Sequence, residues 1–217
     1  MPAPARRILG AVMALLGVAL GAVGAWIALT LGPSGEAHFS ATSKATGAIV
    51  VEPDVLNSLN IPVRVTATRS DGGAVWLAAS PSTDARAILA RSAVSTVSGV
   101  HFPAGTLDLR ASGAGALPDI STADVWRLST EGVGSKNLVV DQGRGPEMVL
   151  VTSGDTTALT NVTMTLTWAH RSWFFEALTA VVIGAIVAAF ALFDLSHSHR
   201  LARRIKAIRA RRSGART

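Results

Sequence analysis

The sequence predicts a membrane protein of α+β class, with two transmembrane helices flanking an all-β, sandwich-like extracytoplasmic domain that contains one short helix. Three observations lead to this prediction. An uncharged apolar run lies near each end of the chain, short β-branched runs separated by turn residues fill the middle, and one proline-led helical pattern interrupts those runs.

The first predicted span covers residues 8–31, after a short basic segment at residues 1–7. It holds no charged residue and is longer than the roughly 20 residues that cross a hydrocarbon core about 30 Å thick. The alternative is a cleavable signal peptide, whose apolar core is usually about 7–15 residues long. Because this run is much longer, we expect the helix to be retained.

The central segment, residues 33–170, is predicted to be one β-rich domain, since its length is typical of one folding unit and its apolar runs are short. The predicted strands are residues 36–42, 46–51, 62–68, 74–79, 94–102, 106–111, 125–130, 137–141, 148–152 and 162–168. In the last of these, Val162, Met164, Leu166 and Trp168 alternate with threonines, which indicates that one face lies in the core.

Two connections in this domain carry specific signals. Residues 71–73, Asp-Gly-Gly, predict a hairpin that makes the strands on either side antiparallel neighbours. Ser80 followed by Pro81 predicts an N-cap and a first helical residue, with the helix continuing to about Arg91. Ile88 and Leu89 would then face the sheet.

The second predicted span covers residues 173–195 and leads into an Arg-rich tail at residues 196–217. Basic residues close to the ends of a span are retained on the cytoplasmic side. They lie outside the pair of spans here, at Arg6, Arg7, Arg200, Arg203, Arg204, Lys206, Arg209, Arg211 and Arg212. We therefore predict a two-pass protein of the plasma membrane with both termini in the cytoplasm. These residues would contact the anionic inner leaflet, as a topology anchor or as a partner-binding tail.

Small residues recur along one face of each predicted span. They are Gly10, Ala14, Gly17, Gly21, Gly24 and Ala28 in the first span, and Gly184, Ala188 and Ala191 in the second, where Val181 interrupts the stripe. Such stripes let helix backbones approach closely, so we predict that the two spans pack on each other as a hairpin. Homo-oligomerisation and docking on another membrane protein are the alternatives.

Charge and cysteine content exclude several classes of protein. The net charge is +6, but residues 33–170 carry nine Lys or Arg against twelve Asp or Glu, a net charge of −3. A nucleic-acid-binding domain would need its basic residues on the folded part, so no nucleic-acid partner is predicted. The chain has no cysteine, which excludes disulfides and Cys-based metal sites.

No arrangement of residues predicts an enzyme, a cofactor or a metal site. His197 and His199, near Asp194, are two residues apart and would point in different directions from a helix. The remaining histidines, His38, His101 and His170, belong to no hydrolase motif, and no phosphate-binding glycine loop is present. We predict no catalytic, cofactor or metal ligands.

Residues 48–54 (AIVVEPD), 73–79 (GAVWLAA) and 124–126 (DVW) resemble the uncharacterised two-span envelope proteins of actinobacteria. The resemblance implies a cell-envelope location and a β-sandwich, but no site residues. The leading hypothesis is a non-enzymatic accessory or scaffold subunit that contacts another membrane or envelope protein. The alternatives are an envelope ligand sensor that couples the outer domain to the basic tail and, third, an extracytoplasmic hydrolase.

Overall fold

The computed structural model describes residues 3–141, 143, 146–155 and 158–213. The chain divides into two compact units. One is helical and comprises the chain up to Gly35 and from His170 onward, and the other is the β-domain, Glu36–Ala169.

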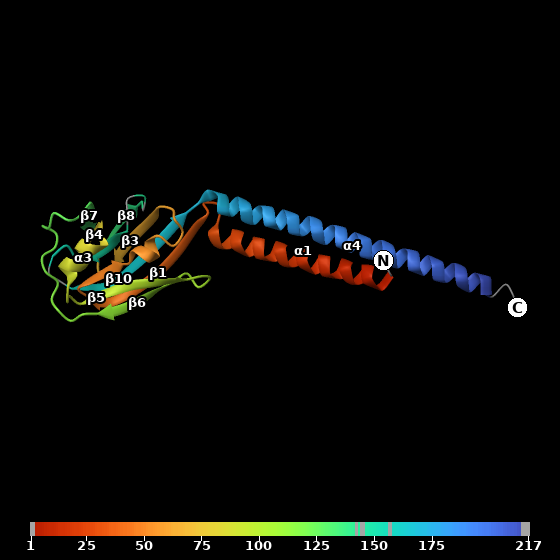
Figure 1. Cartoon of the computed structure of the whole chain (residues 1–217), viewed down its shortest axis with the longest axis horizontal. Helices are drawn as coiled ribbons and strands as arrows, with labels where there is room; N and C mark the ends of the chain where they lie inside the picture. The colour runs from red at the N-terminus through yellow and green to blue at the C-terminus, as the bar shows by residue number, and fades with distance from the viewer. Residues whose placement is uncertain (1–2, 142, 144–145, 156–157, 214–217) are drawn as a thin grey trace. The chain divides into compact units, whose positions relative to one another are not determined.

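The helical unit consists of α1, Ala3–Leu31, and α4, Arg171–Ser213, which lie side by side (Figure 1). Each contains an apolar segment long enough to cross a membrane, Ile8–Leu31 in α1 and Arg171–Ser196 in α4. Only 11% and 17% of the most apolar window in each segment is buried within the structure. The core helix of a water-soluble protein is mostly buried, and these two segments are not.

In the residues that the structure describes, the β-domain is a ten-stranded, nearly closed sheet with two short α-helices (Figure 1). Along the sheet the strands follow the order β7-β4-β9-β2-β5-β6-β1-β10-β3-β8. The strands are β1 Glu36–Thr46, β2 Ala48–Val51, β3 Val63–Arg69, β4 Ala74–Pro81, β5 Val94–His101, β6 Thr106–Ser112, β7 Leu128–Val133, β8 Ser135–Val140, β9 Glu147–Thr152 and β10 Leu159–Ala169. Every predicted strand segment overlaps one of them.

The predicted hairpin at residues 71–73 is wrong, because β3 and β4 are not neighbours in the sheet. β3 pairs with β8 up to Thr68↔Ser135, and β4 pairs with β7 from Ala74↔Val133 onward. Gly134 links β7 to β8 and makes two hydrogen bonds to the chain where β3 leads into β4. The Arg69 N–H donates to the Gly134 carbonyl (2.7 Å), and the Gly134 N–H donates to the Gly73 carbonyl (3.0 Å). β3 and β4 therefore act as one long strand that pairs antiparallel with the long strand formed by β7 and β8. Both long strands bend at the same place, which we call the corner, and residues 70–72 are an insertion in the first of them.

Strands β2, β4 and β9 are buried on both faces. Because side chains alternate along a strand, Ile49, Leu77 and Val151 point to the opposite face from their neighbours Val50, Trp76 and Leu150. The face with Trp76 packs against helix α3, Ser82–Leu89, and the segment after β6. That core cluster contains Ala48, Val50, Trp76, Ala78, Ala85, Leu89, Leu117, Ile120, Met148 and Leu150. The predicted core residues of β10 are also buried.

Helix α3 begins at Ser82, one residue later than predicted. Ser80 remains in β4, where it pairs with Met148, and Pro81 takes the N-cap position without a side-chain cap. The helix ends at Leu89 rather than Arg91, because Ala90 has a positive φ of 40°. The prediction of a single helix is also wrong, since α2, Pro53–Leu56, follows β2 and buries Val55 and Leu56.

Candidate functional site: the paired helices

The two apolar helices meet along a seam of small residues, in which Gly17 and Gly184 are the most crowded glycines. A Cβ atom added to Gly17 would lie 2.6 Å from the Ala188 nitrogen and 2.7 Å from the Gly184 carbonyl oxygen. One added to Gly184 would lie 2.5 Å from the Gly21 nitrogen. Real Cβ atoms do not come this close to backbone atoms, so both positions require glycine for this packing.

The seam continues in both directions with the helices antiparallel. A Cβ atom on Gly24 would lie 2.7 Å from the Ala177 carbonyl oxygen, and one on Gly10 would lie 3.2 Å from the Leu195 side chain. Gly21 is less crowded, with the Val181 carbonyl oxygen at 3.8 Å. Val181 does not break the stripe on α4, because its backbone lies against the glycines.

Burial along the seam repeats every seven residues. Gly10, Gly17 and Gly24 are buried on α1, and Ala177, Gly184 and Ala191 are buried on α4. Ala14, Ala28 and Ala188 are half-buried beside them. A seven-residue repeat is the spacing of residues along the seam between two packed helices. The seam here runs from Gly10 beside Leu195 to Gly24 beside Ala177.

The outward faces of the same helices carry large apolar side chains that the structure leaves exposed. Leu15, Leu29 and Phe190 are among the most exposed, at 73%, 85% and 73%. One groove of about 460 Å³ between the helices is lined by Leu9, Met13, Ile186, Phe190 and Asp194, among others. These surfaces suit acyl chains or another apolar helix.

The ends of the helices hold the predicted basic residues. Arg6 and Arg7 lie in the first turns of α1, and Arg200, Arg203, Arg204, Lys206, Arg209, Arg211 and Arg212 lie in the last part of α4. The backbone there is helical, so the tail extends the second helix, but these side chains lie outside the described residues. The side chains of His197 and His199 also lie outside them.

At the start of α4, a short hydrogen-bonded chain joins three polar residues. The Ser172 hydroxyl donates to Glu176 Oε1 (2.9 Å), and the Ser172 oxygen bonds His170 Nδ1 (2.7 Å). The His170 ring packs on Trp173 with the ring centroids 5.6 Å apart. A Ser–His pair is the start of a hydrolase constellation, but here serine rather than histidine is the middle member, so the arrangement of a catalytic triad is not formed.

The other two candidate histidines lie apart, each with its own partners. His38 bonds Thr167 Oγ1 through Nδ1 (3.1 Å), and its Nε2 lies 3.4 Å from Glu36. His101 Nε2 lies 2.8 Å from Asp108 Oδ2 across the β5–β6 pair. Among the described residues, no group of three or more His, Cys, Asp or Glu side chains could hold a metal ion.

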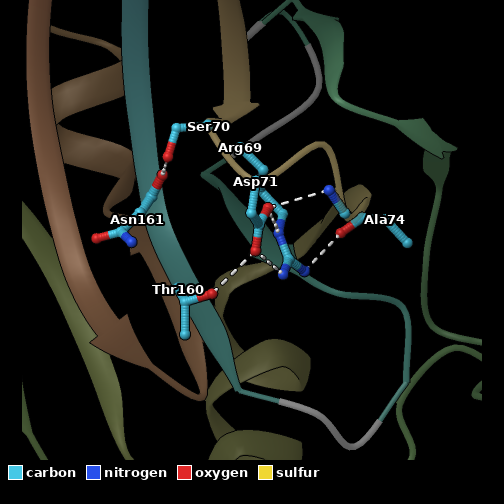
Figure 2. Close-up of polar contacts among 7 residues, drawn as sticks. Arg69, Ser70, Asp71, Ala74, Thr160 and Asn161 are labelled. Carbon is cyan, nitrogen blue, oxygen red and sulfur yellow. Dashed lines mark hydrogen bonds and ion pairs between the residues drawn. The ribbon is translucent and has the colours of Figure 1, made fainter.

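Figure 2 shows a polar cluster at the corner of the sheet, which sequence reasoning missed. Arg69 binds the Asp71 carboxylate through Nε (2.9 Å) and Nη2 (2.7 Å), and the Gly73 N–H (3.0 Å) and Thr160 hydroxyl (3.1 Å) also donate to it. The hydrogen bonds from Arg69, and then from Gly73, lower the pKa of Asp71 well below its usual range. All four donors are used to hold the corner, so this cluster is structural.

Sequence reasoning also missed an ion pair between Arg127, just before β7, and Glu147, the first residue of β9. Glu147 is buried, at 4% exposed, and accepts two hydrogen bonds from the Arg127 guanidinium, which raise the pKa of Arg127. Next to it, Trp126 donates to the Ile120 carbonyl (2.6 Å) and packs edge-on against Trp76. This pair also fixes the packing of a loop rather than forming an open site.

Comparison with known proteins gives no family. No protein-family model matches the chain, and no curated protein matches it. Three solved structures are weakly similar. They are Bacillus endospore appendages described as disulfide-linked pili (14% identity, 62% of this chain and 84% of that chain, TM-score 0.22), Mud Crab Dicistrovirus (10%, 66% and 76%, 0.24) and the flagellar cap protein FliD from Escherichia coli (11%, 93% and 76%, 0.22). TM-scores this low do not indicate a shared fold.

Proposed function

We propose that this protein is a two-pass envelope protein of the plasma membrane that acts, without catalysis, as an accessory or scaffold subunit through contacts with another membrane or envelope protein. Both termini lie in the cytoplasm, and the β-domain faces the other side. The resemblance to two-span actinobacterial envelope proteins agrees with this location.

The observation that supports this proposal most strongly is that the two faces of each apolar helix differ in the size and exposure of their side chains. The pair is closed by a narrow seam of glycines and alanines, while large apolar side chains such as Leu29 and Phe190 remain exposed. A bilayer would solvate those faces, and a partner helix would find a ready packing surface beside the groove at Phe190. The basic residues beyond the apolar segments favour cytoplasmic termini.

The polar groups of the β-domain support a non-enzymatic role. Asp71 and Glu147 each accept two hydrogen bonds from an arginine, Asp71 from Arg69 and Glu147 from Arg127. A catalytic acid or base needs a lone pair or proton that can reach a substrate. The carboxylates of Asp71 and Glu147 use lone pairs to accept hydrogen bonds that hold loops in place.

Orientation is testable because the natural chain has no cysteine. We would introduce Val133→Cys in the β-domain and Thr217→Cys at the C-terminus, one at a time, and treat intact cells with a membrane-impermeant maleimide. Val133→Cys should react in intact cells, and Thr217→Cys only after permeabilisation. The reverse pattern would overturn the proposed topology.

Partner contact is testable by placing a photo-crosslinking amino acid at Phe190, which is 73% exposed on α4. The matched control is the neighbouring residue Ala191, which is buried in the seam and should crosslink only to α1. Irradiation of native membranes should attach one defined protein at Phe190, identified by mass spectrometry. Adducts with lipid alone would contradict the accessory-subunit role.

A ligand-sensing role is the second candidate, favoured by one observation. Helix α4 is continuous from Arg171, two residues after β10, to Ser213 in the basic tail. A change at the start of α4 would therefore reach the tail along one continuous helix. Trypsin cleavage of the tail in inside-out vesicles should then change when envelope extract is sealed inside, and an unchanged pattern would exclude this candidate.

A further inference from the structure

We propose that the tip of the β5–β6 hairpin, residues 102–105, is a membrane-interface contact that inserts Phe102 at the headgroup–acyl boundary of a phospholipid bilayer. This inference rests on the proposed membrane anchoring and adds a lipid contact made by the β-domain itself.

The tip is apolar, exposed and uncharged. Strands β5 and β6 are antiparallel, with His101 paired to Thr106, so residues 102–105 form the turn between them. Phe102 is 56% exposed, and Pro103 and Ala104 are also exposed. Burying this turn in an interface removes apolar surface from water and desolvates no charged side chain of the turn.

The tip lies at one defined end of the β-domain. Strand β1 runs parallel to β6, with Ser40 paired to Thr106, and the Ser40 N–H donates to the Gly105 carbonyl (2.9 Å). Because the strands are parallel, the residues before Thr106 lie beside the residues before Ser40. Accordingly, a Cβ atom on Gly105 would lie 3.2 Å from the His38 carbonyl oxygen.

This end is the one from which the chain continues into both apolar helices. Glu36 begins β1 and pairs with Ala169, the last residue of β10. Glu36 is four residues from Ser40, about 13 Å along a strand. Leu31, the end of α1, is five residues before Glu36, so the two residues are at most about 18 Å apart. The chain therefore limits how far the tip can lie from the end of α1.

A single exposed phenylalanine is common on protein surfaces and needs no explanation by itself. Phe102 differs because of its place in the fold, at the end of the β-domain that continues into the apolar helices. Aromatic side chains are enriched at the membrane–water interface. The opposite end of β10 offers a contrast. There β3 reaches the corner, with Arg69 paired to Val162, and the corner carries charged Arg69 and Asp71. The uncharged tip, with the His101–Asp108 pair at its base, is at the end attached to the helices, and the Arg69–Asp71 pair is at the far end.

The test uses the full-length chain with single cysteines carrying an environment-sensitive nitrobenzoxadiazole label, in phosphatidylcholine–phosphatidylglycerol vesicles. Phe102→Cys is the reporter, Val133→Cys next to the far corner is the matched exposed control, and Leu29→Cys in the first span reports membrane insertion. Emission is measured with and without lipids that carry a doxyl quencher near the headgroup end of the acyl chain.

We expect the label at Phe102→Cys to lose most of its emission with the shallow quencher, and the label at Val133→Cys to keep its emission. If Leu29→Cys is quenched and Phe102→Cys is not, the tip contact is wrong while the membrane anchor stands. If neither is quenched, the anchor itself is wrong. Equal urea midpoints for the parent chain and the Phe102→Cys variant, followed by tryptophan emission, establish that the reporter chain is folded.

Discussion

Gly17 of α1 and Gly184 of α4 lie so close that a single methyl group on either residue would overlap the backbone of the other helix. The two glycines therefore set the distance between the helices. Ala177 and Ala191, seven residues to either side of Gly184, are buried in the same seam.

Replacing Gly17 with leucine should separate the helices. Overpacking a close-packed contact costs about 1–3 kcal/mol, and here the obstacle is backbone that cannot rotate away. Energy transfer between labels at Leu16→Cys and Ile183→Cys, both exposed positions, would report the separation during an SDS titration in mixed micelles. The midpoint should fall for Gly17→Leu and for Gly184→Leu.

The matched controls are Ala19→Leu and Ala185→Leu, which place the same side chain on exposed positions close to the seam glycines. They should leave the midpoint unchanged. Equal losses at seam and control positions would mean that α1 and α4 do not pack through the glycines.

Replacing Asp71 with asparagine should make the β-domain less stable at neutral pH and remove a pH-dependent part of its stability. The folded-state pKa of Asp71 is lowered, so its stabilising effect is full above the unfolded value of about 4 and disappears as the pH falls through the lower folded value. The difference in urea midpoint between the parent chain and Asp71→Asn should therefore shrink on acidification.

Asp124→Asn, at an exposed carboxylate in the loop before β7, is the control and should show no such difference. If the difference in urea midpoint between the parent chain and Asp71→Asn stays constant from neutral to strongly acid pH, the Arg69–Asp71 ion pair does not stabilise the corner.

Removing the arginine of the buried pair should cost more than removing both partners. Arg127→Ala leaves the Glu147 carboxylate, 4% exposed, without its partner, and we expect a loss of about 1–3 kcal/mol. The double variant Arg127→Ala with Glu147→Gln should recover part of that loss. Urea unfolding of the full chain would measure both, and additive losses would show that the two residues do not interact.

Truncating Leu89 should loosen α3 from the sheet. Leu89 is 6% exposed and lies in the core cluster with Trp76 and Met148, so Leu89→Ala should cost about 2–5 kcal/mol. Thr83→Ala, on the exposed side of the same helix, is the control and should change stability little. Similar losses at both positions would show that the burial assigned to α3 is wrong.

The strands were predictable because their signals are local. Alternation in β10 and β-branched runs elsewhere follow from the pleat of a strand, and every predicted segment overlaps an observed one. The start of α3 was less predictable, because Ser80 carries a capping side chain but is held in β4 by its pairing with Met148, a contact between residues far apart in the sequence.

The corner could not be read from the sequence. Asp-Gly-Gly is a good hairpin sequence, and only the pairing of β3 with β8 and of β4 with β7 shows that the chain continues forward there. The glycines of α1 were visible as a stripe, but which residues of α4 they meet depends on the register of two helices. Pairs such as Arg127 and Glu147 are distant along the chain and gave no local signal.

The corner also bears on aggregation. Since β7 and β8 end the sheet on its two sides and join through Gly134, they form one bent free edge in the described part of the domain. A flat, apolar edge would recruit strands from other chains. This edge instead changes direction at a glycine with φ of 77° and carries Glu131 and Lys136 on either side of it. A domain without disulfides therefore has protection against strand addition along this edge.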